Sequence, residues 1–168
     1  YHKLLVISDV AVIPLPDFKQ KIVQIGYLAR TANLLGIKTP KIACIAPSEQ
    51  LLPNVISSTE GALLAKMADR GQLGDVIVDG PLSLDVALYK EVAEHKKVKG
   101  SSVAGDPDCL LFPNLESANV FFKSVTHLCG GELAAMVMGT KVPCVLTSRG
   151  DTSKTKLYSI ALACLAAK

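Results

Sequence analysis

Apolar positions along the chain gather in six short runs. The runs cover residues 4–8, 41–46, 75–80, 109–113, 134–139 and 143–148. Nearly continuous apolar runs, unlike runs that alternate with polar residues, are typical of strands buried on both faces, as in a parallel sheet. The pattern therefore predicts a strand at each run.

Between these runs, apolar positions recur at helical spacing. The expected helices cover residues 17–35, 57–70, 82–94, 114–129 and 152–168. Asp17 and Asn114 are residue types that cap a helix N-terminus, and Ser57 and Glu60 have the spacing of a capping box. Strands and helices thus alternate, which predicts an α/β fold with a mainly parallel sheet and helices on both faces. Ligands of such sheets bind outside the carboxyl ends of the strands.

The amino-acid composition limits the classes of protein to which the chain can belong. Hydrophobic residues make up 49% of the 168 and charged residues 20%, as in a packed globular chain of one domain or two small lobes. The net charge of +3, with no arginine-rich or aromatic-basic stretch, argues against nucleic acid as a partner. No apolar run reaches the roughly 18–20 residues that a membrane helix needs.

The termini and cysteines add two expectations. The chain starts at Tyr1 and enters an apolar run almost at once, so we expect the N-terminus of a longer protein to be missing. The five cysteines are widely spaced without a CxxC motif. This favours free thiols in a reducing cytoplasm and gives no sign of a zinc site.

Ser148, Arg149 and Gly150 stand where a predicted strand gives way to the last helix. The N–H groups and dipole of a helix N-terminus attract an anion, and an arginine can hold two oxygens of one phosphate. Ser148 and Thr152 would add hydroxyl donors. The stretch is therefore a candidate oxyanion site, although an ordinary capped helix with Arg149 paired to Asp151 explains the same residues.

Asp79, Gly80 and Pro81 form a second candidate, followed one helical turn later by Asp85. A Gly-Pro turn lets the backbone approach a ligand, and the two carboxylates could orient a polar group. A tight strand–helix turn with a capping residue is the structural alternative.

Two weaker patterns involve cations. Glu116, Asn119, Lys123 and His127 recur every three to four residues and share one helix face, which could face a phosphate or simply solvent. The lysines in residues 96–99 could attract a phosphorylated ligand or form a solvated helix end. No GxxxxGK[ST], GxGxxG or HExxH motif occurs, which disfavours nucleotide-hydrolase, Rossmann-cofactor and zinc-protease functions.

Longer segments resemble a known family. "DVIVDGPLSLDVAL" and "AGDPDCLLFPNLESANVFFKSVTHLCGGELAAMVMGTKVPCVLTSR" are similar to the phosphate acetyl/butyryl transferases, closest to the phosphate butyryltransferase branch. The resemblance implies an isocitrate/isopropylmalate dehydrogenase-like architecture of two α/β lobes. Residues 1–140 would be the second lobe. Residues 141–168 would be a closing strand and helix that return to the absent first lobe.

The resemblance also implies an activity. A short acyl group, butyryl or similar, would move between coenzyme A and inorganic phosphate, giving an acyl phosphate. Coenzyme A would be a substrate, with no cofactor, metal or covalent enzyme intermediate. The protein would be a homodimer or higher homo-oligomer, and this segment alone would be inactive.

Site residues are implied by position in the family's motifs. Ser148 and Arg149 match its catalytic phosphate-binding pair, which Gly150 and Thr152 follow. The remaining expected phosphate or acyl-CoA contacts are Asn119, Lys123, Asp79, Gly80, Pro81 and Asp85. Two positions depart from the pattern: Phe122 replaces a frequent Tyr, and Thr155 replaces the Asp of acetyl-transferring members.

Alternative functions stay open at this stage. The protein could have phosphate acetyltransferase specificity, or it could bind coenzyme A or phosphate without turnover. The metal-dependent hydroxyacid dehydrogenases share the implied architecture, but the sequence has no clustered Asp triad to hold their cation.

Overall fold

The structure, a computed structural model, describes residues 1–167. The chain divides into two compact units, Tyr1–Asn119 and Val120–Lys168, which we call the first and second unit.

A four-stranded sheet forms the centre of the first unit. All neighbouring strands are parallel, in the order β1-β4-β2-β3. The strands are β1 (Val6–Ser8), β2 (Lys41–Ile45), β3 (Ile77–Leu82) and β4 (Cys109–Leu111). Four of the predicted strands and their parallel pairing are thereby confirmed.

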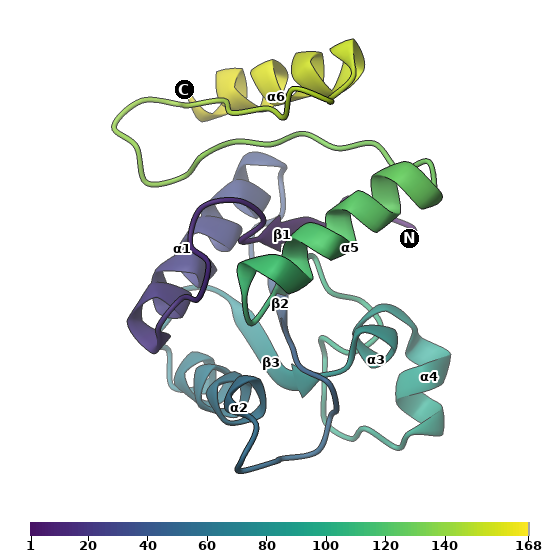
Figure 1. The fold of residues 1–168 in the computed structure, drawn as a ribbon. Coiled ribbons are helices and arrows are strands. Elements are labelled where there is room, and N and C mark those ends of the chain that lie inside the picture. The colour runs from purple at the N-terminus through teal and green to yellow at the C-terminus, as the bar shows by residue number, and fades with distance from the viewer. Residues whose placement is uncertain (168) are drawn as a thin grey trace. The chain divides into compact units, whose positions relative to one another are not determined.

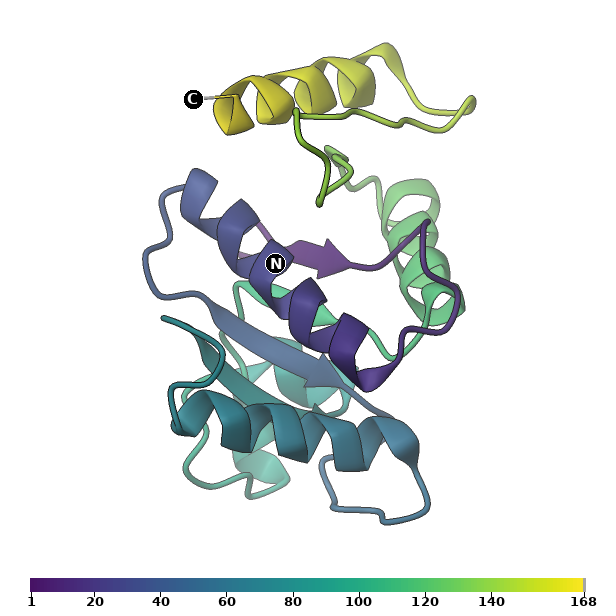
Figure 2. The ribbon, with the colours of Figure 1, turned by 90° about the vertical axis from the view of Figure 1, so that its left-hand side faces the viewer.

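Helices lie on both faces of this sheet, as the alternation predicts. α1 (Phe18–Leu34) and α2 (Ile56–Asp69) cover one face. The short helices α3 (Leu84–Leu88) and α4 (Lys90–His95) lie on the other (Figures 1 and 2). α5 (Leu115–Leu128) follows β4 and runs from the first unit into the second.

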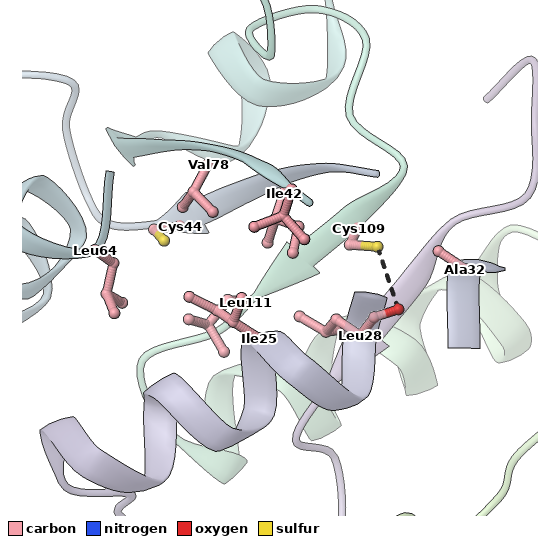
Figure 3. Close-up of a cluster of buried hydrophobic side chains, with 10 residues drawn as sticks. Ile25, Leu28, Ala32, Ile42, Cys44, Leu64, Val78, Cys109 and Leu111 are labelled. Atoms are coloured by element: carbon pink, nitrogen blue, oxygen red, sulfur yellow. Dashed lines mark hydrogen bonds between the residues drawn. The ribbon is translucent and has the colours of Figure 1, made fainter. Parts of the chain in front are cut away.

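The core lies between α1 and the sheet. Figure 3 shows Ile25 and Leu28 of α1 directed at side chains of the strands, among them Leu111. Each of these three is at most 3% exposed. Burying an aliphatic side chain of this size stabilises the fold by roughly 1.5–3 kcal/mol. The Cys109 thiol lies 3.9 Å from the Leu28 carbonyl oxygen, so its polar group also has a partner.

The N-cap predicted for α1 is confirmed, whereas the one predicted for α2 is wrong. Asp17 caps α1 by accepting a hydrogen bond from the Gln20 N–H, and the Gln20 side chain accepts one from the Asp17 N–H, both at 2.8 Å. The capping box predicted at Ser57 is wrong, because α2 begins one residue earlier and Val55 is its N-cap, without a side-chain hydrogen bond. Glu60 instead forms an ion pair with Lys21 of α1.

The predicted helix over residues 82–94 is divided into α3 and α4 at Tyr89, whose backbone is extended. The cause is a segment remote in sequence. The Gly105 N–H donates to the carbonyls of Val86 and Ala87, at 3.1 and 2.9 Å, and a continuous helix would use both oxygens internally. A Cβ on Gly105 would lie 2.5 Å from the Lys90 Cα, so only glycine permits this approach.

The second unit contains α6 (Ser153–Ala166) and the segment that precedes it. The predicted strands at 134–139 and 143–148 are wrong: one antiparallel bridge joins Val137 to Cys144, and the described residues form no strand there. An apolar run becomes a strand only beside a hydrogen-bonding neighbour, and these residues have no sheet to join. Instead the Ala135 N–H donates to the buried Ser159 hydroxyl of α6, at 2.9 Å.

Within the described part of the chain, no helix is long and apolar enough to cross a bilayer.

Candidate functional site

Asp79, Gly80 and Pro81 lie inside β3, which continues to Leu82, so the predicted end of the strand at Gly80 and the Gly-Pro turn after it are corrected. Ala43 pairs with Asp79 but Ile45 pairs with Leu82, so two residues of β3 oppose one residue of β2. This is a β-bulge, a device that bends a strand and redirects its side chains. The Asp79 carboxylate accepts a hydrogen bond from the next N–H, that of Gly80, at 2.8 Å.

Close packing explains why the bulge contains glycine. A Cβ on Gly80 would lie 2.6 Å from the Cβ of Cys44, the β2 residue that the bulge faces. On the α2 side, a Cβ on Gly61 would lie 3.3 Å from both Cys44 and Pro81. Burial raises the pKa of the Cys44 thiol to about 12, with a smaller contribution from Asp79, so Cys44 is a packing residue.

Asp85, on α3, is held by a cation from the end of α4. The Lys96 Nζ lies 3.0 Å from an Asp85 carboxylate oxygen and 3.6 Å from one of Glu49. Hydrogen bonding by Ser83 and then by Lys96 lowers the pKa of Asp85 to about 2. The Ser83 hydroxyl also lies 3.2 Å from Glu49, so its single proton is shared between two carboxylates. The network keeps Lys96 charged, and the hydrogen bond to Asp85 raises the pKa of Lys96.

A hollow of about 310 Å³ opens beside this network. It is lined by Glu49, Leu51, Asp79–Leu82 and Lys96–Lys99, and we call it the β3 hollow. Three predicted site residues, Asp79, Gly80 and Pro81, are therefore brought together here with the lysines after α4. Sequence reasoning missed Glu49 and Ser83, since nothing local links them to a site.

Asn119 lies near the end of another strand, β1. Its Nδ2 donates to the Val10 carbonyl, at 2.9 Å. The same loop is shaped by Asp9, whose carboxylate accepts N–H hydrogen bonds from Ala11, Val12 and Ile13 at 2.7–3.1 Å. Asn119 thus ties the first part of α5 to the loop that follows β1, a role that helix spacing does not reveal. Asp9 was also missed, although an Asp directly after an apolar run was its signal.

Lys123 follows Asn119 by one turn of α5 and so shares its helix face. Its Nζ lies 5.0 Å from the centre of the Phe122 ring, which is within range of a cation–π contact. Phe122 thus contacts the Lys123 cation through its ring.

Ser148, Arg149 and Gly150 form an exposed turn before α6. Thr152 is the N-cap, and its hydroxyl accepts from the Thr155 N–H at 3.1 Å. The Asp151 carboxylate accepts from the Ser148 N–H at 2.7 Å. Within residues 1–167 no carboxylate pairs with Arg149, so the ordinary ion pair with Asp151 is not formed.

The predicted site residues therefore fall into separate groups. The first unit holds the β3 bulge, Asp85 and Asn119, and the second holds Lys123, Ser148, Arg149, Gly150 and Thr152. Among the described residues, no group of three or more His, Cys, Asp or Glu side chains is placed to hold a metal ion.

The fold is an open parallel α/β sheet, a class of protein in which ligands bind outside the carboxyl ends of the strands. The chain belongs to the family described as "Phosphate acetyl/butaryl transferase", whose model matches residues 2–164. This confirms the resemblance carried by the sequence motifs.

Individual proteins with phosphate acyltransferase names are also similar to this chain. The chain is 43% identical to the phosphate butyryltransferase of Clostridium acetobutylicum over 99% of its length, and 41% identical to the phosphate acetyltransferase of Thermotoga maritima over 96%. It covers 55% of each of these relatives, so it spans about half their length.

A solved structure shares the fold. The branched-chain phosphotransacylase of Enterococcus faecalis V583 superposes with a TM-score of 0.87 at 32% identity. That match covers 95% of this chain and 56% of the other.

Proposed function

We propose that the protein carrying this chain transfers a short acyl group, butyryl or similar, between coenzyme A and inorganic phosphate. The observation that carries the proposal is the turn before α6, where Arg149 has no carboxylate partner within residues 1–167 and stands beside a helix N-terminus. A guanidinium without a carboxylate partner, close to the positive end of a helix dipole, suits a phosphate dianion.

The turn before α6 would stabilise the negative charge that develops in this reaction. A phosphate oxygen attacks the thioester carbonyl carbon, and the C–S bond breaks to give acyl phosphate and the coenzyme A thiolate, which then takes a proton. Negative charge grows on the carbonyl oxygen before the bond breaks, and preorganised donors such as Arg149 and Ser148 stabilise it. Holding two reactants in contact supplies up to roughly 7–11 kcal/mol of the rate enhancement.

The other predicted residues are assigned substrate contacts of their own, each within its own unit. Asn119 and Lys123 supply donors from one face of α5. Asp79, Gly80 and Pro81 line the β3 hollow and are assigned to contact with the substrate there. Asp85 acts through Lys96, to which it is already paired.

The proposed architecture has two lobes like those of isocitrate and isopropylmalate dehydrogenases. Residues 1–140 are assigned to one lobe and 141–168 to a closing segment that returns to the other. Exposed apolar side chains on α6, such as Leu157 and Ile160, support a partner for this helix. A homo-oligomer is proposed in addition. A cytoplasmic location is also proposed, because the described cysteines are all free thiols, as expected in a reducing compartment.

Acetyl transfer is the second candidate, and the similarity to the Thermotoga maritima phosphate acetyltransferase favours it. Thr155 argues for butyryl transfer, because acetyl-transferring members carry an Asp where this chain has a hydroxyl. In the structure that hydroxyl lies 3.1 Å from the one of Thr152.

One assay tests the proposal. The protein as its gene encodes it is mixed with phosphate and either butyryl-CoA or acetyl-CoA, and released thiol is followed. Phosphate-dependent release with a higher kcat/KM for butyryl-CoA is the expected result. A preference for acetyl-CoA would reassign the acyl group, and coenzyme A binding without release would leave a binding protein.

A further inference from the structure

Lysines 97 and 99 line the β3 hollow without a partner of their own. Within residues 1–167 neither ammonium group has an ion pair or a hydrogen bond, and both residues are exposed. Lys96, by contrast, is already held by Asp85 and Glu49. The hollow therefore presents two cations that the fold itself does not use.

The backbone at Lys97 is unusual as well. Its φ is 58°, in the left-handed region, and it is the only non-glycine residue among those described that adopts a positive φ. Glycine takes this conformation at the end of a helix without strain, whereas a lysine there costs stability. Residues kept in such conformations are concentrated at functional sites.

The two carboxylates that line the hollow, Glu49 and Asp79, form no ion pair with Lys97 or Lys99 among the described residues. Glu49 accepts from the Ser83 hydroxyl and faces Lys96, and Asp79 accepts from the Gly80 N–H. The wall also includes apolar surface, since Leu51 is 70% exposed. The hollow thus offers apolar surface and unpaired ammonium groups side by side.

Resting on the proposed function, we infer that Lys97 and Lys99 bind phosphate groups at the nucleotide end of the acyl-CoA substrate. Coenzyme A joins a purine nucleoside with several phosphates to its thiol-bearing arm. Ammonium groups on flexible stems suit exposed, hydrated phosphates, whereas the planar guanidinium of Arg149 suits the reacting orthophosphate. The two anions would then be recognised by different parts of the chain.

Two variants test the inference in the protein as its gene encodes it. Lys97→Gly removes the ammonium group and relieves the left-handed strain, so the fold should be kept or stabilised. Lys99→Met removes the other charge at similar side-chain volume. Lys66→Met, on α2 and away from the hollow, is the matched control for loss of one exposed positive charge.

Calorimetric titrations with coenzyme A, pantetheine and inorganic phosphate provide the readout. Each hollow variant should weaken coenzyme A binding about tenfold or more, the usual effect of losing one charge-assisted hydrogen bond. Binding of pantetheine and orthophosphate should stay unchanged, and Lys66→Met should bind like the parent. The salt dependence of coenzyme A binding should also decrease in the hollow variants.

Several results would overturn the inference. Unchanged coenzyme A affinity in both variants would exclude a role for the lysines, and a loss of orthophosphate affinity would assign them to the reacting phosphate. A parent protein that does not bind coenzyme A would refute both this inference and the proposed function. A parent that binds coenzyme A through these lysines but transfers no acyl group would refute the proposed function alone.

Discussion

The Nζ of Lys96 lies 3.0 Å from the carboxylate of Asp85, which links the residue after α4 to the first turn of α3. The two helices are separated at Tyr89, so this pair, together with Glu49, holds the end of α4 against α3 and beside the β3 hollow. The pair therefore shapes the wall that bears the unpaired lysines.

We predict that Asp85 titrates near pH 2. Its pKa is lowered by hydrogen bonding from Ser83 and then by Lys96. A lowered folded-state pKa means that ionised Asp85 stabilises the protein above its unfolded pKa of about 3.9, and that this contribution is lost as the pH falls toward 2. Carboxyl NMR titration measures the midpoint directly. Lys96→Met and Ser83→Ala should each move it upward, and an unshifted midpoint in the parent would disprove the pairing.

Gly80→Ala should destabilise the protein. The added Cβ would lie 2.6 Å from the Cβ of Cys44 and 3.1 Å from its carbonyl oxygen, so the bulge must move. Overpacking of this kind costs about 1–3 kcal/mol. Gly26→Ala is the matched control, because it lies inside α1 with open space around it and should gain roughly 0.5–1 kcal/mol. Chemical denaturation distinguishes the two, and equal stabilities would contradict the packing.

Lys21 and Glu60 form an ion pair in which the two side chains are only 6% and 18% exposed. Lys21→Met leaves the Glu60 carboxylate without its counter-charge, which we expect to cost about 3 kcal/mol in the free energy of unfolding. The double variant Lys21→Met with Glu60→Met should recover most of that loss, because no unpaired charge remains. A double variant that is less stable than Lys21→Met would contradict this expectation. It would mean that the ion pair stabilises the protein by more than the desolvation of its two charges costs.

The cysteines should differ sharply in reactivity. Burial raises the pKa of Cys44 and of Cys109 to about 12, so neither thiol forms appreciable thiolate at neutral pH. Cys129 and Cys164 are exposed. Treating the folded protein with a thiol reagent at pH 8 and mapping the labels by mass spectrometry should show Cys129 and Cys164 modified first. Labelling of Cys44 and Cys109 should require denaturant, and early labelling of either would contradict its burial.

Arg149→Ala should raise the KM for phosphate and lower kcat by at least ~100-fold, the scale of losing one preorganised donor. Lys in the same position keeps the charge but loses the planar pair of donors, so Arg149→Lys should recover only part of the loss. Arg30→Ala, an exposed position on α1, controls for removal of an arginine. Turnover within tenfold of the parent would remove Arg149 from the site.

Local patterns were sufficient where a short stretch specifies its own structure. The Asp17 cap of α1 needs only neighbours within one turn of helix. The parallel arrangement of four strands followed from their continuous apolar character. Family motifs, which are also stretches of sequence, identified the phosphate acetyl/butyryl transferase family.

The errors arose where a remote segment decided the outcome. Gly105 takes the carbonyls that would have continued α3 into α4, and Cys44 stands opposite the β3 bulge. The apolar runs at 134–139 and 143–148 have strand propensity, but among the described residues one bridge between Val137 and Cys144 joins them, which is too short to form a strand.

The sequence by itself determined which segments become helices or buried strands in the first unit, because burial and capping depend on residue type and spacing. It also determined the family through its motifs. Only the tertiary structure decided that Lys96 pairs with Asp85, that Arg149 lacks a carboxylate partner within residues 1–167, and that Lys97 and Lys99 line one hollow. Pairing and exposure depend on groups far apart in the chain, and no local pattern encodes which of them meet.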